Sequence, residues 1–445
     1  MTRDRLRGKT GRPRSSGWVC PPLRIPRGTR GIRGVTLTRI QEASLRLIFD
    51  SRGRPTVEAT IRTQSGVEGH AGAPSGASTG AHEVPAFPKG GVTEAIATFH
   101  AQVRPRLIGV EIGDQRAIDE VLHQVDGTND FSHIGGNTAT AVSVASARTH
   151  ARESHLELWQ VVRASQEGGP VFPGIVGNCI NGGRHAIGGP DIQEFIAYST
   201  APRPYDAIRA AIEVHRTIGE ALHRRFPKYA LGRGDEGGWV APLGNLEAVE
   251  LLTESCAEVR DRLHLPVHPG LDLAASEFYR DDRYRYQDQT VDAAGQLGFV
   301  SHLIDRFDLR YIEDPFDQEA YASFAELTRT MGTKALIVGD DIFTTSVARI
   351  ERGLVPAASN AVLIKVNQVG TLTDTVAAVD LARRHGLATV TSHRSGEVPE
   401  GWLAQLAVGF GSVGLKCGVL GGERVAKLNE LLRLAAATES TTDDS

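Results

Sequence analysis

The segments ALIVGDD (residues 335–341), SVARIERGL (346–354) and AVLIKVNQ (361–368) decide the fold. The first and third are apolar runs typical of strands, and the second spaces its apolar residues as one face of a helix does. A strand–helix–strand unit makes its two strands parallel and places their carboxyl ends on the same face of the sheet. Because Asp340 and Lys365 end these strands, we expect them to lie close together and to bind a metal ion or an anionic substrate.

Strand and helix patterns alternate in the same way from residue 171 almost to the end of the chain. This alternation predicts a parallel sheet, and a length of roughly 250 residues with about eight strands favours a closed barrel over an open doubly wound sheet. The predicted fold class is therefore α/β, a (β/α)8-type barrel. We expect its start to be irregular, because the strand patterns at 171–183 and 191–199 are not separated by a long helix.

The chain before the barrel has strand patterns first and helical patterns after them, which indicates an α+β amino-terminal domain. Within it, AGAPSGASTGAHE (71–83) has the composition of a flexible loop that can wrap a ligand with backbone groups. The predicted division has four parts: a basic extension (1–35), the α+β capping domain (36–165), the catalytic barrel (166–435) and a polar tail (436–445).

The composition is that of an ordinary globular protein, with 40% hydrophobic and 23% charged residues. No apolar run is long enough to span a membrane, and the four cysteines have neither the spacing of a zinc site nor that of a disulfide framework. We therefore expect a protein of the reducing cytoplasm, with no membrane partner.

Residues 1–35 differ from the rest by charge, because they hold ten Lys or Arg and a single acid, Asp4. They are broken by Pro and Gly and show no amphipathic period, which predicts disorder. One interpretation is a tether to nucleic acid or to an acidic surface. We favour the other, a dispensable tail or an upstream stretch that is not normally translated, and we expect no nucleic-acid partner.

Polar or charged residues close the predicted barrel strands. The set is Glu194, Glu236, Asp272, Glu313, Asp340, Lys365, His393, Arg394, Ser395 and Lys416. A lone acid in such a place is more often a cap or turn residue, but a whole set in a regular repeat indicates the active site of a barrel enzyme. Asp272, Glu313 and Asp340 come from successive strands and would repel one another unless a hard cation neutralised them. Oxygen ligands favour Mg²⁺ over zinc.

The remaining residue types indicate the rest of the chemistry. Arg394 and Ser395 supply a fork of donors and a hydroxyl, which suit a phosphate. Lys365 and Lys416 lie, in this interpretation, near a divalent cation and low-dielectric walls. We therefore expect both lysines to have depressed pKa values and to serve as base and electrostatic clamp.

Several long motifs follow one another between Thr36 and Leu434. They are DSRGRPTVEATI (50–61), PSGASTGAHE (74–83), NCINGGRHA (178–186), IQEFI (192–196), GDEGG (234–238), LDLAASEF (271–278), IEDPFDQEAY (312–321), IVGDD (337–341), LIKVNQVGTLTDT (363–375), SHRSGE (392–397) and ERVAKLNELLR (423–433). In this order the chain resembles the enolase family. The resemblance implies a Mg²⁺-dependent lyase of glycolysis and gluconeogenesis that reversibly dehydrates 2-phosphoglycerate to phosphoenolpyruvate through a metal-stabilised enediolate.

The resemblance also implies roles for single residues. Lys365 matches the base that removes the C2 proton, and Glu236, with Glu194 beside it, matches the acid that helps the C3 hydroxyl to leave. Lys416 matches a residue that holds the substrate carboxylate. His393 is also expected to be a catalytic residue.

Metal and substrate ligands are implied in the same way. The expected ligands of the structural Mg²⁺ are Asp272, Glu313 and Asp340, and Ser78 is expected to bind a second ion, which gives two ions per active site. The residues expected to bind a small phosphorylated substrate are Gln193, His185, Arg394, Ser395 and Lys416. The family resemblance further suggests a homo-oligomer, a dimer or larger.

Two departures from the family pattern lie near the expected site. The segment after Glu83 (84–92) is shorter than usual, and Arg184 stands directly before His185 where a small residue is usual. They leave open a divergent paralogue of specialised metabolism that makes a phosphonate or carboxyphosphonate analogue of phosphoenolpyruvate. An alternative of a different class is a non-catalytic binding protein that kept the fold.

Overall fold

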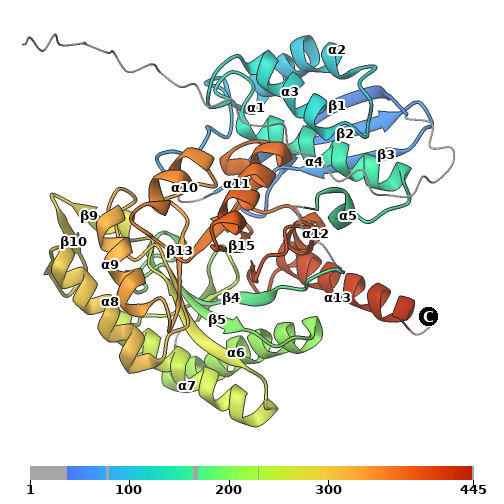
Figure 1. Ribbon diagram of the computed structural model, residues 1–445. Coiled ribbons are helices and arrows are strands. Elements are labelled where there is room, and N and C mark those ends of the chain that lie inside the picture. The colour runs from blue at the N-terminus through green and yellow to red at the C-terminus, as the bar shows by residue number, and fades with distance from the viewer. Residues whose placement is uncertain (1–37, 77–79, 164–168, 229, 443–445) are drawn as a thin grey trace, which may run out of the picture. The chain divides into compact units, whose positions relative to one another are not determined.

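The computed structural model describes residues 38–76, 80–163, 169–228 and 230–442. These residues belong to one compact unit, Leu37–Ser445, and Figure 1 shows the path of the chain through it. The predicted basic extension (1–35) and the predicted metal ligand Ser78 lie outside the described residues.

An antiparallel sheet and a set of helices form the amino-terminal part. The elements are β1 (Ile40–Phe49), β2 (Pro55–Thr63), β3 (Glu68–Gly72), α1 (Gly91–Thr98), η1 (Phe99–Val103), α2 (Arg104–Leu107), α3 (Gln115–Asp126), α4 (Gly136–Glu153) and α5 (Leu158–Val161). The strands pair in the order β1–β2–β3. Val57, Ala59 and Ile61 on β2 are buried and alternate with more exposed residues, as in a strand with one face in the core. The predicted α+β organisation is confirmed, although the sequence patterns missed β3 and α3.

Helix α4 is buried along nearly its whole length, and its residues are mostly Ala, Ser, Thr and Val. Their small size lets the sheet approach closely. A Cβ added to Gly69 on β3 would lie 2.5 Å from Thr149 Oγ1 of this helix, so glycine is required at that crossing. At the other end of α4, Asn137 donates a hydrogen bond to Ser75 Oγ (2.9 Å) at the start of the glycine-rich loop.

A ring of eight strands forms the barrel. They are β4 (Gly174–Asn181), β5 (Glu194–Ser199), β8 (Val267–Asp272), β12 (Tyr311–Glu313), β13 (Leu336–Gly339), β14 (Ala361–Ile364), β15 (Ala388–Ser392) and β16 (Gly414–Lys416). The helices of this part are α6 (Pro204–Arg225), α7 (Asn245–Leu263), α8 (Ala293–Phe307), α9 (Tyr321–Met331), α10 (Val347–Leu354), α11 (Leu372–Arg384), α12 (Trp402–Gly409) and α13 (Gly422–Thr442). The short elements are η2 (Gly183–His185), β6 (Gly232–Arg233), β7 (Trp239–Val240), η3 (Ala275–Phe278), β9 (Tyr279–Arg280), β10 (Arg283–Arg285), β11 (Thr290–Val291) and η4 (Val366–Gln368).

The ring closes because β16 pairs with β4, so the predicted barrel with an irregular start is confirmed. Strand β5 is the exception to the predicted parallel sheet, since it pairs antiparallel with both β4 and β8. The segment between β4 and β5 contains only the three-residue η2, which is too short to carry the chain back across the barrel. β5 therefore returns beside β4 as the second strand of a hairpin.

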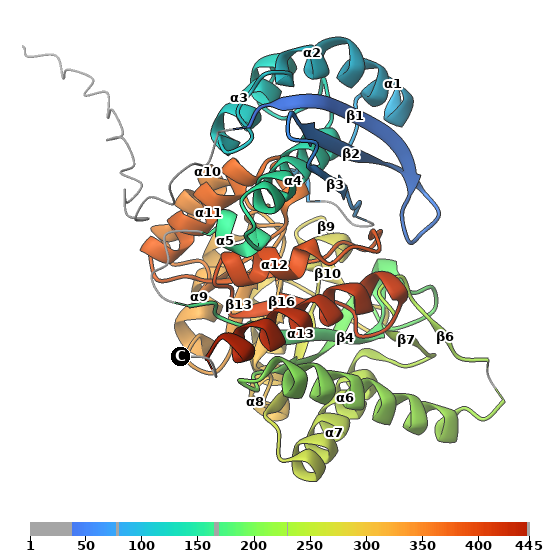
Figure 2. The same ribbon diagram turned by 90° about the vertical axis from the view of Figure 1, so that its right-hand side faces the viewer.

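Apolar side chains fill the inside of the barrel. They are Val176, Ile196, Tyr198, Tyr311, Val338, Ala361, Leu363 and Val390. The long helices lie outside the strands, as the view in Figure 2 shows for α6, α7 and α13. Because the interior is packed, polar side chains that point into the barrel are confined to its end, as in other barrels of this kind.

Hydrogen bonds hold the described ends of the glycine-rich loop over the carboxyl ends of the strands. On the amino-terminal side, Ser75 and Gly396 exchange two backbone hydrogen bonds of 2.8 Å, and Asn367 Nδ2 donates to Pro74 O (3.0 Å). On the other side, Ala81 N donates to Gln318 Oε1 (3.0 Å). The amino-terminal part thereby contributes to the mouth of the barrel.

Candidate active site

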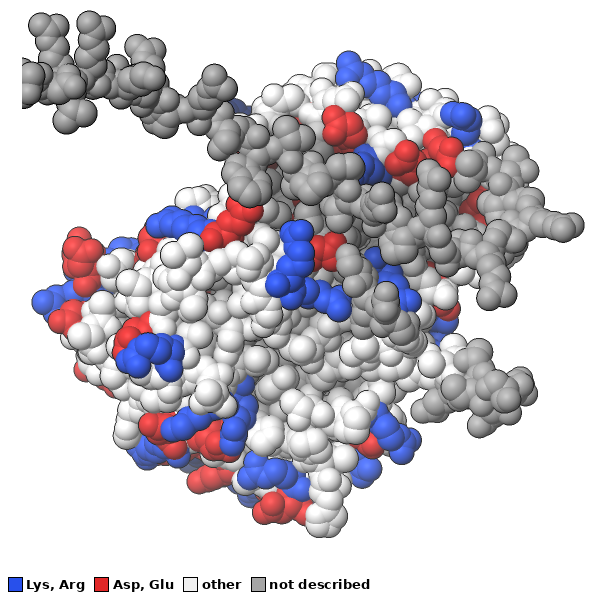
Figure 3. All heavy atoms as spheres, in the orientation of Figure 1, with Lys and Arg blue, Asp and Glu red and all other residues white. Residues whose placement is uncertain are grey.

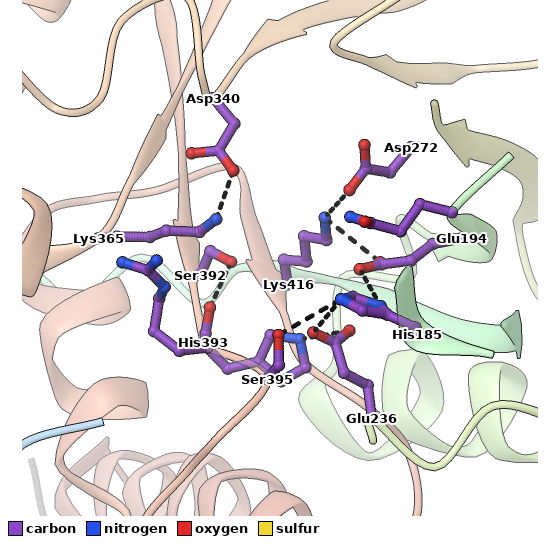
Figure 4. Close-up of a pocket in the computed structure, with 12 residues that line it drawn as sticks. His185, Glu194, Glu236, Asp272, Asp340, Lys365, Ser392, His393, Ser395 and Lys416 are labelled. Atoms are coloured by element: carbon purple, nitrogen blue, oxygen red, sulfur yellow. Dashed lines mark hydrogen bonds and ion pairs between the residues drawn. The ribbon is translucent and has the colours of Figure 1, made fainter. Parts of the chain in front are cut away.

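One pocket at the barrel mouth collects most of the polar residues that the sequence predicted (Figure 4). It is lined by His185, Gln193, Glu194, Glu236, Asp272, Asp340, Lys365, Ser392, His393, Arg394, Ser395 and Lys416. Glu313 is completely buried and joins the same group through Lys416. Sequence reasoning missed Ser392, although it ends β15 and the strand-end rule could have found it.

Most of the polar residues that were predicted to close barrel strands do lie at strand ends. Asp272, Glu313 and Lys416 are the last residues of β8, β12 and β16, and Asp340 and Lys365 follow β13 and β14 directly. The crossover unit that the sequence indicated around residues 335–368 therefore brings an acid and an amine to one place.

Two residues of the set do not end a barrel strand, which corrects the prediction. Glu194 is the first residue of β5 and reaches the mouth because that strand runs antiparallel. Glu236 lies in the turn between β6 and β7, two strands of two residues each. The surrounding GDEGG segment is too rich in glycine to form a longer strand.

Lys416 is the centre of a buried cluster of acids. Its Nζ donates to Asp272 Oδ2 and Glu313 Oε1 at 2.8 Å each and lies 3.3 Å from Glu194 Oε2. Burial lowers the pKa of Lys416, but Asp272, Glu194 and Glu313 outweigh burial and raise it well above its ordinary value. Tyr311 completes the cluster by donating its hydroxyl to Glu313 Oε2 (2.6 Å).

Lys365 forms an ion pair with Asp340, whose other oxygen accepts a hydrogen bond from Gln368 Nε2 (2.8 Å). Burial lowers the pKa of Lys365, but Asp340 outweighs it, and the pKa lies above its ordinary value. Without a bound cation the pKa values of Lys365 and Lys416 are therefore raised, whereas the expected depressed values apply to a site with a divalent cation nearby. The physical reason is that each ammonium lies directly against carboxylates, whose charge favours the protonated form.

Two groups of described residues have ligand atoms within 4.8 Å of one another. They are Asp314, Asp340 and Asp341, and His185, Glu194 and Glu236. The predicted triad is not one of them, because Asp272 and Glu313 bind Lys416 whereas Asp340 binds Lys365. Asp314 was not predicted. It accepts hydrogen bonds from the backbone N–H groups of Asp340 and Asp341 (3.0 and 2.8 Å) and so positions Asp340.

These acids nevertheless fit a hard cation. Burial, with Asp272 beside it, raises the pKa of Glu313 to about 8. Burial and the neighbouring Asp341 raise the pKa of Asp314 well above its ordinary value. Acids also outnumber ammonium groups here, because Lys365 and Lys416 are the partners of a cluster that contains Asp272, Glu313, Asp314, Asp340 and Asp341. A divalent cation with oxygen ligands relieves such a surplus.

Two histidines join Glu194 and Glu236 on the other side of the pocket. His393 Nε2 lies 3.0 Å from Glu236 Oε2, and His185 lies 3.5 Å from Glu194 and 3.9 Å from Glu236. Burial and Glu236 raise the pKa of Glu194 well above its ordinary value. Burial also opposes ionisation of Glu236, but His393 and His185 outweigh it and hold the pKa of Glu236 below its ordinary range. Glu194 therefore binds a proton more readily than Glu236, and the two carboxyls can share one proton.

Arg394 is held in place before any ligand binds. Its guanidinium is buried and donates to both oxygens of Glu83 (2.8 and 3.2 Å) and to Asn367 Oδ1 (2.9 Å). The only sequence signal for Glu83 is its place at the end of the glycine-rich loop. Next to Arg394, Ser395 Oγ lies 3.3 Å from His185 Nε2. Gln193 Oε1 is buried and has no hydrogen-bond partner among the described residues, so it can accept one from a ligand.

Comparison with known proteins agrees with this geometry. The models of two families, described as "Enolase, N-terminal domain" and "Enolase, C-terminal TIM barrel domain", match residues 40–162 and 170–443. The chain belongs to the enolase family. The enolase of Halorubrum lacusprofundi is 44% identical over 402 residues, 90% of this chain and 99% of the relative. The enolase of Methanothermobacter thermautotrophicus is 44% identical over 401 residues (89% and 96%), and that of Picrophilus torridus is 39% identical over 395 residues (89% and 98%).

As a member of the enolase family the chain is an enzyme, a hydro-lyase, as the sequence predicted. The roles of single residues and the boundaries of the four predicted parts stay predictions. Among the described residues of this enolase-family chain, no helix combines the length and the apolar character needed to cross a membrane.

Proposed function

We propose that this enolase-family enzyme reversibly dehydrates 2-phosphoglycerate to phosphoenolpyruvate in glycolysis and gluconeogenesis. The observation that carries the proposal is the composition of one buried pocket. It combines an amine (Lys365), two carboxyls that can share a proton (Glu194 and Glu236) and a preoriented guanidinium (Arg394). These groups suit a substrate that loses a proton and a hydroxyl and carries a phosphate.

Asp272, Glu313 and Asp340 would hold a Mg²⁺ ion, and we propose Ser78 as a ligand of a second ion. When bound, Mg²⁺ supplies positive charge that neutralises the carboxylates around Lys365 and Lys416 and polarises the carboxylate of the substrate. We assign the binding of that carboxylate to Lys416, whose ammonium lies among the acids at the end of β16.

Lys365 is the proposed base. Because Asp340 raises the pKa of Lys365, a cation bound at Asp340 would lower it and favour the neutral amine. In the forward direction the C2–H bond breaks, its proton goes to this neutral amine, and the electron pair forms the C2–C3 double bond. The C3–O bond breaks, and the hydroxyl takes a proton from the Glu194–Glu236 pair and leaves as water. Gln368 and Lys365 both hold Asp340, so the amine is fixed at the end of β14 while it exchanges the proton.

Arg394 and Ser395 are the proposed phosphate ligands. Because Glu83 and Asn367 already orient the guanidinium, little side-chain freedom remains to be lost when the phosphate binds. Gln193, His185 and His393 are proposed to complete the pocket, the last as a catalytic residue through its contact with Glu236.

The test is the formation of phosphoenolpyruvate from 2-phosphoglycerate with Mg²⁺, followed by absorbance. We expect turnover that a chelator abolishes and Mg²⁺ restores. Lys365→Ala should lower kcat by a factor of about 10²–10⁴, the range for loss of a general base. Lys334→Ala, which removes an exposed lysine paired with Asp305, is the matched control and should retain activity. Absence of turnover of 2-phosphoglycerate by the wild-type enzyme would contradict the proposal.

One observation favours a second candidate, a paralogue that makes a phosphonate or carboxyphosphonate analogue of phosphoenolpyruvate. Arg184 Nε donates to Glu277 Oε2 (2.7 Å), which ties η2, where Arg184 directly precedes the pocket residue His185, to η3. The discriminating experiment compares kcat/KM for 2-phosphoglycerate with that for phosphonate analogues. A higher value for an analogue would establish the second candidate.

We also propose that the enzyme is a cytoplasmic homo-oligomer, a dimer or larger, with no nucleic-acid partner. Cys179, Cys256 and Cys417 are buried free thiols, which suits a reducing compartment. Leu47 and Phe49 on β1 are 44% and 64% exposed and offer apolar surface for a subunit contact. Light scattering on the purified chain measures the mass, and a monomer would be evidence against the oligomer.

A further inference from the structure

Arg424, near the start of α13, has the largest fully buried side chain in the described part of the chain. A buried guanidinium is unfavourable unless its N–H groups find acceptors. Its acceptors belong to the two loops that carry the site: Asp235 O (3.1 Å), beside Glu236, and the carbonyls of Arg394 and Ser395 (both 2.6 Å). Its ion pair, with Glu423 (3.3 Å), is on its own helix.

The same guanidinium touches His393. Arg424 Nη1 lies 2.8 Å from His393 Nδ1, and the N–H of Gly418 points at the same nitrogen (3.4 Å). A guanidinium and a peptide N–H can only donate, so Nδ1 accepts and carries no proton. Burial, assisted by Arg424, lowers the pKa of His393 to about 4, so the ring is neutral near pH 7. The single ring proton is then on Nε2, which faces Glu236 Oε2 at 3.0 Å.

We propose that Arg424 is a positioning residue that fixes His393 as the Nε2–H tautomer, through which His393 orients the Glu236 carboxylate. Glu236 Oε2 accepts from His393 and from Asn178 Nδ2 (3.2 Å), which leaves Oε1 to meet the substrate. Only the statement that Glu236 Oε1 meets the substrate rests on the proposed function. The tautomer is a property of the enzyme itself.

The first experiment needs no variant. The wild-type chain is labelled with ¹⁵N-histidine, and the imidazole signals of His393 are assigned by their loss in His393→Gln. We expect a protonated Nε2 and an unprotonated Nδ1 at neutral pH. A proton on Nδ1, or a doubly protonated ring, would overturn the proposal. If the tautomer is as expected and 2-phosphoglycerate is not turned over, the proposed function fails and the assignment of Arg424 stands.

The second experiment uses variants of α13. Arg424→Met should lower kcat about 10–100-fold, as loss of an outer supporting contact does, and should leave KM for 2-phosphoglycerate nearly unchanged because Arg424 lines no part of the pocket. It should also release the tautomer, with a proton appearing on Nδ1. Arg424→Lys keeps a hydrogen-bond donor and should restore part of the kcat and part of the Nε2–H tautomer.

Lys427→Met is the matched control, because it removes another fully buried cation from the same helix. Lys427 Nζ donates to Val398 O, Glu400 O and Glu423 O (3.0 Å each) and forms an ion pair with Glu397 (2.8 Å). None of these contacts is to His393 or Glu236. It should lower the melting temperature and keep the Nε2–H tautomer. If Arg424→Met lowers the melting temperature but keeps wild-type kcat and tautomer, Arg424 is merely structural and the proposal is wrong. If Arg424→Met does not fold, the proposal is tested by the His393 signals of the wild-type chain and by the kcat and tautomer of Arg424→Lys.

Discussion

Glu313 shows how the site balances charge at the scale of one residue. Its carboxylate is completely buried, and its two oxygens are held by Lys416 Nζ (2.8 Å) and the Tyr311 hydroxyl (2.6 Å). Its pKa is nevertheless raised to about 8, because burial and the neighbouring Asp272 outweigh Lys416. A cation bound at the same oxygens would stabilise the folded enzyme by linkage.

We therefore expect Glu313→Gln to bind Mg²⁺ at least about tenfold more weakly, because a metal-binding carboxylate becomes a neutral amide. Glutamine keeps the shape and can still accept from Lys416. The measurement is the melting temperature as a function of Mg²⁺ concentration, which is independent of turnover. Glu326→Gln, which alters an exposed glutamate paired with Arg329 on α9, is the control. Equal Mg²⁺ dependence in wild type and Glu313→Gln would remove Glu313 from the metal site.

The sequence could predict which residues gather at the mouth, because strand-end positions follow from periodicity. It could not predict how they pair. The raised pKa of Lys365 depends on a direct contact with Asp340, which only the folded chain shows. Arg424 was missed for a related reason, since in ERVAKLNELLR a charged residue at helical spacing indicates a solvated face. Long-range acceptors on two loops make its burial favourable, and a helical pattern does not contain them.

At the scale of elements, the turn that carries Glu236 depends on close packing against the segment after β16. Gly237 has a φ of +82°, and a Cβ at this position would lie 2.5 Å from Leu420 O. His215 Nε2 on α6 also contacts the Gly237 carbonyl (2.8 Å). The turn is thus fixed from two sides, which holds the Glu236 carboxylate at the pocket.

Gly237→Ala should displace this turn, because a left-handed φ and a backbone clash act together. We expect a lower melting temperature and a kcat reduced by more than the stability loss explains, since Glu236 moves away from His393. Gly66→Ala is the matched control: its φ of +88° is similar, but nothing lies within 4 Å of the added Cβ. Activity of Gly237→Ala equal to that of Gly66→Ala would contradict the expected role of the Leu420 contact.

Helices α3 and α11 meet through Asp119, a buried carboxylate that accepts from Thr373 N (3.0 Å), Thr373 Oγ1 (2.5 Å) and Gln115 Nε2 (3.0 Å). Burial, opposed by these hydrogen bonds, raises the pKa of Asp119 to about 6. The unfolded value is about 3.9. Protonation of Asp119 therefore contributes about 3 kcal/mol to the free energy of unfolding. This contribution is fully present below pH ~4 and is lost as the pH rises through ~6.

Asp119→Asn should remove this pH dependence. Relative to wild type, the variant is expected to be more stable at pH 8 than at pH 4.5, because an amide has no proton to lose. The measurement is the difference in melting temperature between variant and wild type across that range. Asp114→Asn, which removes a carboxylate from the start of α3, is the control. A difference that does not change with pH would show that Asp119 is not responsible.

Element types were predictable from apolar spacing, but strand direction was not always so. β5 has the same apolar pattern as a parallel barrel strand, with every residue buried. Its direction follows from the short connection to β4, which the sequence showed only as an irregular start. This reversal explains why Glu194 begins its strand and still faces Lys416 (3.3 Å).

At the scale of the whole molecule, acidic and basic side chains are interspersed on the face in Figure 3. Ion pairs also join acidic and basic side chains on the described surface, for example Arg225–Glu247, Arg306–Glu250 and Arg352–Glu319. A surface of mixed sign gives a polyanion little attraction, because binding to nucleic acid depends on many uncompensated cations. An affinity for nucleic acid would then have to come from residues 1–35, which contain ten Lys or Arg.

We expect a chain that begins at Thr38 to turn over 2-phosphoglycerate as the full chain does. The family models begin to match at residue 40, and the pocket is lined by residues between His185 and Lys416. The same truncation should abolish whatever binding of double-stranded DNA the full chain shows at low salt, because it removes the excess of positive charge. Turnover and DNA gel shifts of the two chains, at low and high salt, measure both effects. Loss of turnover in a truncated chain that keeps the melting temperature of the full chain would show that the extension takes part in catalysis.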